Sequence, residues 1–199
     1  MLWNDDHKLA FCHTPRTGGT ALQGAFFVPD VGTLQWQHSG YKHSAWKELD
    51  TKTQDRIKNY TMICVHRNPY DRMISMYQHW ILRPGRHNYG CCEFEQWIKS
   101  TRYNLYPREH RLSQSHFCEG LPEHTIYIPF AELGSAWDYL RSHVPESLQF
   151  WLKANVNSSV EYVDPSKVLT SKAVQWINQH HAQDFDRFKY KKLDAQEKI

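Results

Sequence analysis

The sequence predicts an α/β fold, formed by a single domain over residues 1–199 with a short, mainly parallel sheet flanked by helices. Two segments carry this prediction, at residues 9–26 and 60–81. In each, a short apolar run typical of a buried strand leads through a polar turn into apolar residues at helical spacing. The length and an aromatic content of 14% suit a folded domain with a sizeable core rather than a disordered chain.

The first segment has the layout of a phosphate cradle. A strand at Leu9 to Cys12 is followed by a turn with the paired Gly18 and Gly19 and then by a helix. Glycines let the backbone come close to an anion, and the free amides at a helix start attract it. Arg16 adds a positive charge before the glycines. No Lys-Ser/Thr pair follows them, so this is not the ATP-type P-loop.

The second segment ends in a matching group of polar residues. An apolar run from Tyr60 to Val65 is followed by Arg67 and by Pro69, which is suited to the first turn of a helix. The predicted helix places Ser75 on its polar face, about two turns along. We expect Arg67 and Ser75 to reach one anion beyond the strand ends, where open α/β sheets bind ligands.

Both segments resemble motifs of sulfotransferases that use 3′-phosphoadenosine 5′-phosphosulfate (PAPS). The 5′-phosphosulfate loop of that family is similar to His13-Thr-Pro-Arg-Thr-Gly-Gly-Thr20. Its 3′-phosphate motif is similar to Val65-His-Arg-Asn-Pro-Tyr-Asp-Arg-Met-Ile-Ser-Met-Tyr77. The resemblance is nearest to the carbohydrate branch, which includes the heparan 2-O-sulfotransferases and many small bacterial members. It extends to Gln114-Ser115 and to a C-terminal signature at Asp184-Phe-Asp-Arg-Phe-Lys-Tyr190.

The resemblance implies the P-loop NTPase-like sulfotransferase fold and an enzyme that moves a sulfuryl group from PAPS to an acceptor hydroxyl, with carbohydrate favoured. The products would be 3′-phosphoadenosine 5′-phosphate (PAP) and a sulfate ester. No metal is expected, because arginines and backbone amides would neutralise the phosphates. Arg67 and Ser75 would bind the 3′-phosphate. The phosphosulfate would lie against Pro15, Arg16, Thr17, Gly18, Gly19, Thr20 and Ala21.

The resemblance also points to catalytic residues. Members of the sulfotransferase family have a proposed general base just before a helix. His43 fits this position best, because it precedes a predicted helix near Ser44; His38 is the alternative. A near-neutral imidazole suits removal of a hydroxyl proton, although a histidine at a helix start can also simply cap or pack. Arg16 stands where most relatives have a catalytic lysine, and its larger, forked guanidinium makes the exchange non-neutral.

The acceptor is expected near residues 82–115, which lack periodicity. Gln114 and His38 are candidate acceptor-binding residues. Arginines suit carboxylates or sulfates, and aromatic rings suit sugars, but a solvated loop is an equal alternative. The basic and aromatic residues here are Arg83, Arg86, Tyr89, Arg102, Tyr103, Tyr106, Arg108, His110 and Arg111. Nucleic acid is not expected as a partner, because no reader motif is present and the net charge is only +3.

The five cysteines predict neither a disulfide framework nor a regular zinc site. Cys12 and Cys64 lie in apolar strands and are expected to be small core residues. A metal site at His87, Cys91 and Cys92 is conceivable, but adjacent cysteines are not the usual zinc spacing.

Two other classes of function stay open at this point. An ATP-dependent kinase or nucleotide hydrolase on the same scaffold would need a magnesium carboxylate and usually a P-loop lysine, which is absent. A non-catalytic module that binds PAP or a polyanionic glycan is kept open by Arg16. No apolar run has the length of a membrane span, and the N-terminus does not resemble a signal peptide, so we expect a cytoplasmic protein without a membrane partner.

Overall fold

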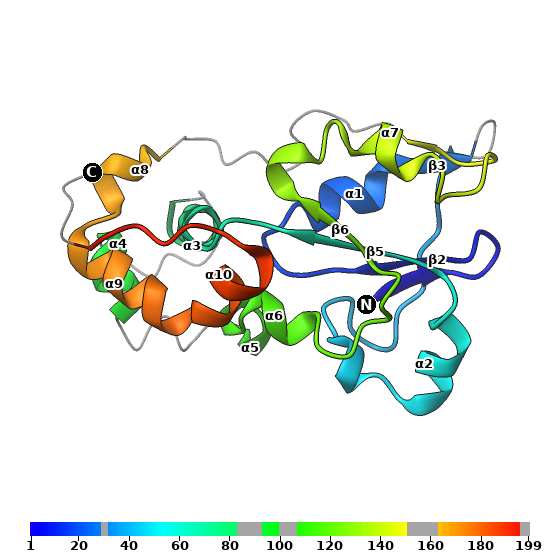
Figure 1. Cartoon of the computed structure of the whole chain (residues 1–199), viewed down its shortest axis with the longest axis horizontal. Coiled ribbons are helices and arrows are strands. Elements are labelled where there is room, and N and C mark those ends of the chain that lie inside the picture. Colours follow the sequence, from blue (N-terminus) through cyan, green and yellow to red (C-terminus); the bar gives the residue numbers. More distant parts are fainter. Residues whose placement is uncertain (29–31, 83–92, 100–106, 151–162, 196–199) are drawn as a thin grey trace. The chain divides into compact units, whose positions relative to one another are not determined.

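The structure is a computed structural model, and the chain divides into two compact units (Figure 1). The first unit comprises Met1–His66 and His116–Asn157, and the second comprises Arg67–Ser115 and Ser158–Ile199. Each unit has its own hydrophobic core. The structure describes residues 1–28, 32–82, 93–99, 107–150 and 163–195.

The first unit is built on a four-stranded sheet with the order β1-β2-β5-β6. Its strands are β1 (Leu2–Asn4), β2 (Leu9–Cys12), β5 (Thr61–His66) and β6 (Ile126–Pro129). The pairs β2–β5 and β5–β6 are parallel, and only β1 is antiparallel to its neighbour β2. The predicted α/β class with a mainly parallel sheet is therefore confirmed. The strand β1 was not predicted, because three residues are too few to show a periodic pattern.

Successive residues of the parallel strands point to opposite faces of the sheet. Phe11 of β2, Val65 of β5 and Ile128 of β6 share one core with residues of α1 (Gly19–Ala25) and α7 (Ala136–Leu140). Figure 1 shows both helices on the same side of the sheet and α2 (Thr51–Ile57) on the other. The residues between, such as Ala10 and Met62, are also fully buried. Burial on both faces explains why these strands read as continuous apolar runs in the sequence.

Two predicted helices of the first unit differ in the structure. The helix expected at the end of the segment 9–26 stops at Ala25, where the chain passes directly into β3 (Phe26–Val28). The helix expected near Ser44 is only the short 3₁₀ turn η1 (Trp46–Glu48), and α2 begins later. Asp50 caps α2 by accepting a hydrogen bond from the Thr53 amide at 2.8 Å. This cap is a stronger signal for a helix start than Ser44.

A small antiparallel sheet has the order β4-β3-β7, with β4 at Gly32–Thr33 and β7 at Gln149–Phe150. The 3₁₀ turn η4 covers Phe130–Glu132.

The second unit is helical in the part that the structure describes. Its principal helix, α3 (Pro69–Tyr77), continues into a π-helical turn at Gln78–Leu82. The other helices are α4 (Phe94–Lys99), α5 (Arg108–Arg111), α6 (Gln114–Phe117, in which the division between the units falls), α8 (Pro165–Val168), α9 (Ser171–His180) and α10 (Ala182–Phe188). None of the helices in the described ranges is both long and apolar enough to cross a membrane.

The chain between Ser171 and Phe188 forms two helices, α9 and α10, that are divided at His181. His181 has backbone angles of φ −116° and ψ 24°, which lie outside the helical region. It is only 2% exposed and so belongs to the core. The break redirects the chain so that α10 presents Asp184 to the interior, where this carboxylate is 0% exposed.

Candidate functional site

The turn between β2 and α1 requires glycine at its two paired positions. Gly18 has a φ of 85°, in the left-handed region that disfavours side chains. A Cβ atom on Gly18 would also lie 2.7 Å from the Phe130 ring. A Cβ atom on Gly19 would lie 1.7 Å from Cδ2 of His13. The backbone of this loop is therefore packed against neighbouring rings without room for side chains. Packing within the protein explains the two glycines, and the role of the loop as a phosphate cradle stays a prediction.

His13 fills the space beneath the loop and links it to His43. The rings of the two histidines are stacked with their centroids 4.4 Å apart and their planes at 24°. The Nδ1 atom of His43 lies 2.7 Å from the carbonyl oxygen of His13. A carbonyl oxygen only accepts hydrogen bonds, so a neutral His43 carries its proton on Nδ1. Its Nε2 then holds a lone pair, which is the form that a general base needs.

His43 is therefore placed by the structure at the base of the glycine loop, within the same unit. Its side chain is buried, with 8% exposed, and the Tyr41 ring packs edge-on against it at a centroid distance of 5.3 Å. The alternative base, His38, is an exposed residue. The structure thus brings His43, His13 and Gly19 together in one packed group.

The remaining residues of the loop have different surroundings. Arg16 is partly exposed and has a φ of 66°, a backbone conformation that costs roughly 1–2 kcal/mol for a residue with a side chain. Strain of this kind is concentrated at functional sites. Thr17 is buried, and its hydroxyl donates to the Thr14 carbonyl at 3.0 Å, so its side chain holds the turn and leaves the backbone to meet a ligand. Pro15 is buried, whereas Thr20 is exposed and Ala21 half-buried.

In the second unit, Gln114 holds the main chain of Arg67 on both sides. The Arg67 amide donates to Oε1 of Gln114 at 2.7 Å, and Nε2 of Gln114 donates to the Arg67 carbonyl at 2.7 Å. Gln114 is only 1% exposed. Its amide is therefore occupied in positioning Arg67, and the contact with an acceptor that was expected of it stays a prediction. Burial lowers the pKa of Arg67, while the nearby Asp71 raises it.

Asp184 holds the main chain at Gln114 and Ser115 in place. Its two carboxylate oxygens accept hydrogen bonds from the backbone amides of Gln114 at 2.9 Å and Ser115 at 2.7 Å. Burial raises the pKa of Asp184, but the His181 side chain, the Arg72 charge and these amides together lower it to about 2. The carboxylate is therefore ionised at neutral pH and fixes the start of α6. Sequence reasoning did not assign Asp184 a role; its signal was an acidic residue among the apolar positions of a helix.

Ser75 lies on the polar face predicted for α3, but much of this face is buried. Ser75 and Arg72 are 4% and 1% exposed, whereas Asp71 is exposed. The Arg72 guanidinium donates to the Leu112 carbonyl at 3.0 Å, so the buried charge has a partner in the chain. Asn68 caps α3 by accepting from the Tyr70 amide at 3.0 Å, and Pro69 takes the first helical position as expected. Ser75 is thus held on a rigid, buried helix.

Several predicted residues lie outside the described ranges. They include the conceivable metal ligands His87, Cys91 and Cys92 and most of the basic and aromatic residues of the acceptor region. Of the basic and aromatic residues of that region, the structure describes Arg108, His110 and Arg111, all of which lie in α5.

Comparison with known proteins identifies the family of the chain. The model of the sulfotransferase family matches residues 1–191. Carbohydrate sulfotransferase 10 of Danio rerio is 26% identical over 120 residues, an alignment that covers 55% of this chain and 31% of that protein. The chain therefore spans about a third of the curated relative it matches. No solved structure matches it. The chain belongs to the sulfotransferase family, a family of transferases that take their sulfuryl group from PAPS.

Proposed function

We propose that this protein transfers the sulfuryl group of PAPS to a hydroxyl of a carbohydrate acceptor, with His43 as the general base. The observation that carries the assignment of the base is the 2.7 Å contact between Nδ1 of His43 and the His13 carbonyl. It fixes the tautomer that leaves Nε2 ready to accept a proton. The carbohydrate acceptor is supported by the similarity to carbohydrate sulfotransferase 10 of Danio rerio and by the resemblance to the carbohydrate branch.

The residues present fit PAPS. Gly18 and Gly19 let the loop pack closely on Phe130 and His13, and Arg16 adds a forked cation that suits a phosphosulfate. The loop from Pro15 to Ala21 would bind the phosphosulfate. In the second unit, Arg67 and Ser75 would bind the 3′-phosphate, with Gln114 as the positioning residue for the main chain of Arg67.

The chemistry needs little from the protein beyond binding and proton transfer. PAPS, when bound, supplies an activated sulfuryl group with a phosphate leaving group. Arg16 would offset the negative charge that remains on the phosphate side. His43 would accept the acceptor's hydroxyl proton at Nε2 as the new sulfur–oxygen bond forms and the bond between sulfur and the phosphate oxygen breaks. The proposed products are PAP and a sulfate ester, and no redox change occurs.

The first experiment tests the donor. A ligand that binds only the folded protein raises its melting temperature by mass action. We expect PAP to raise it more than AMP, which lacks the 3′-phosphate, and more than ATP with magnesium. If ATP with magnesium stabilises the protein and PAP does not, the proposed donor is wrong.

The second experiment separates catalysis from packing at His43. His43→Asn keeps a side-chain amide near the position of Nδ1, and so retains the hydrogen bond to the His13 carbonyl, but offers no base. We expect PAP binding to stay within about threefold and turnover of PAPS with a panel of oligosaccharides to fall by a factor of about 10²–10⁴. His38→Ala tests the alternative base: if His38 only contacts the acceptor, turnover at saturating acceptor should stay near that of the wild type. Full activity in His43→Asn would refute the assignment. An inactive wild type that still binds PAP would favour the non-catalytic module.

A further inference from the structure

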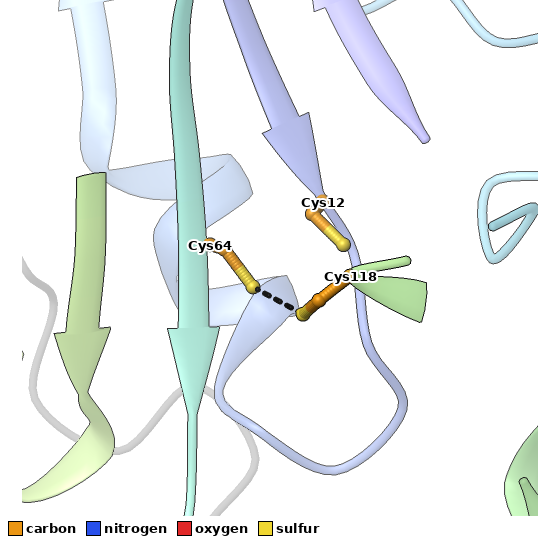
Figure 2. Close-up of side chains that lie close together, drawn as sticks. All are labelled: Cys12, Cys64 and Cys118. Atoms are coloured by element: carbon orange, nitrogen blue, oxygen red, sulfur yellow. Dashed lines mark hydrogen bonds between the residues drawn. The ribbon is translucent and has the colours of Figure 1, made fainter. Parts of the chain in front are cut away.

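Three cysteines of the first unit converge on one buried point (Figure 2). Cys12 ends β2, Cys64 lies in β5, and Cys118 directly follows α6. Each is at most 1% exposed, and none forms a disulfide. The Sγ atoms of Cys64 and Cys118 are 3.3 Å apart, and all three sulfur atoms lie within 4.8 Å of one another.

The fold places these side chains together. Cys12 and Cys64 are partners in the parallel register of β2 and β5, so their side chains leave the same face of the sheet. Cys118 comes from a segment 54 residues beyond Cys64 and meets them on that face. The contact of the Cys12 thiol with the Phe117 carbonyl, at 3.5 Å, anchors the same segment.

We propose that Cys12, Cys64 and Cys118 form a site for one thiophilic closed-shell metal ion, of the class of copper(I) and zinc(II). Three sulfur atoms around an ion at the usual metal–sulfur distance of about 2.3 Å form a triangle with edges of about 4.0 Å. The edge between Cys64 and Cys118 is shorter than this value, at 3.3 Å, and no edge exceeds 4.8 Å. Lengthening the Cys64–Cys118 edge by about 0.7 Å, through small changes of the side-chain torsions, brings that pair to coordination geometry.

A bound cation would stabilise the thiolate form of this group. The thiolate is the form that binds metals. Several buried thiolates repel one another unless a cation lies between them. Each thiol that becomes a ligand releases its proton to solvent, so binding needs no oxidant or reductant.

The ligand set indicates which ions fit. Sulfur ligands select copper(I) and zinc over the hard cations magnesium and calcium. Among the described residues, no fourth histidine, cysteine, aspartate or glutamate ligand joins the three. Copper(I) is satisfied by three thiolates, whereas structural zinc is almost always four-coordinate and would need water as its fourth ligand. The ion would be structural and separate from sulfuryl transfer, for which no metal is expected. It would fix the end of β2, directly before the glycine loop.

Metal analysis of the purified, tag-free full chain tests the proposal. The protein is offered zinc(II), or copper(I) under a reductant, dialysed against a weak chelator, and its metal content is measured. We expect about one ion per chain, bound to sulfur at about 2.3 Å by X-ray absorption. This spectrum is taken on the wild type, so the result does not depend on a variant that folds poorly. The absence of stoichiometric binding of either ion, or ligation without sulfur, overturns the proposal.

Cysteine variants assign the ligands. The Cys91→Ser/Cys92→Ser double variant removes the other two cysteines of the chain and should keep the ion. Cys118→Ser, checked for folding by circular dichroism, should lose at least nine-tenths of it. Retention in Cys118→Ser, or loss in the double variant, overturns the assignment. A wild type that contains no metal and has lost two mass units through a Cys64–Cys118 disulfide would also overturn it.

Discussion

Replacing Gly19 by alanine tests whether the glycine loop, His13 and His43 form one packed unit. The new Cβ atom would lie 1.7 Å from Cδ2 and 2.1 Å from Nε2 of His13, where ordinary contacts begin at 3.4 Å. The ring would have to retreat by more than an ångström. It is not free to do so, because it is 3% exposed and packs against Phe11 at 5.4 Å and His43 at 4.4 Å between centroids.

The expected cost follows from this overlap. Inserting a methyl group into a well-packed site destabilises a protein by about 1–3 kcal/mol. In a chain of this length, each kcal/mol lowers the melting temperature by roughly 2–4 °C. Movement of the His13 ring also disturbs the stacked His43, so we expect PAP affinity and turnover to fall together with stability.

Gly24 provides the matched control in the same helix. A Cβ atom there meets nothing within 4 Å, so Gly24→Ala should leave PAP binding unchanged and raise the free energy of unfolding by up to about 1 kcal/mol. Urea unfolding measures both variants. Removing the ring in His13→Ala/Gly19→Ala should make the two changes less than additive, because the methyl group then has space. A Gly19→Ala protein as stable as the wild type, or strict additivity in the cycle, would refute the reasoning.

Three further predictions follow from the surroundings of the site. First, the folded-state pKa of Asp184 is about 2, below the ordinary value of 3.8. Its carboxylate therefore contributes about 2 kcal/mol to the free energy of unfolding above pH 4, and this contribution is lost as the pH falls through 2. In urea titrations, Asp184→Asn should lower the stability at pH 6 and flatten the decline of stability below pH 4. Second, Gln114→Ala leaves the Arg67 amide and carbonyl without their partner, so PAP affinity should fall at least tenfold while AMP affinity changes little; equal losses for both ligands would contradict a role at the 3′-phosphate. Third, Arg16→Lys should keep PAP affinity within about threefold and alter turnover, whereas Arg16→Ala should weaken PAP binding at least tenfold; unchanged binding in Arg16→Ala would argue against Arg16 as a ligand.

The local features of this protein could be predicted from its amino-acid sequence. The strand, glycine turn and helix at residues 9–25, and the strand and helix at residues 61–77, follow from apolar runs, from paired glycines and from Pro69 at a helix start. Each of these signals lies within a few residues of the structure that it specifies. The α/β class and the family motifs could therefore be predicted before any contact was known.

The contacts between side chains that are distant in the sequence became visible only in the folded chain. The contact of His43 with His13 spans 30 residues, the hydrogen bonds of Gln114 with Arg67 span 47, and those of Asp184 with α6 span 69 and 70. No local pattern specifies such pairs, because they depend on how the chain packs and not on its periodicity. The cysteine cluster could not be predicted for the same reason, because the register between β2 and β5 brings Cys12 beside Cys64.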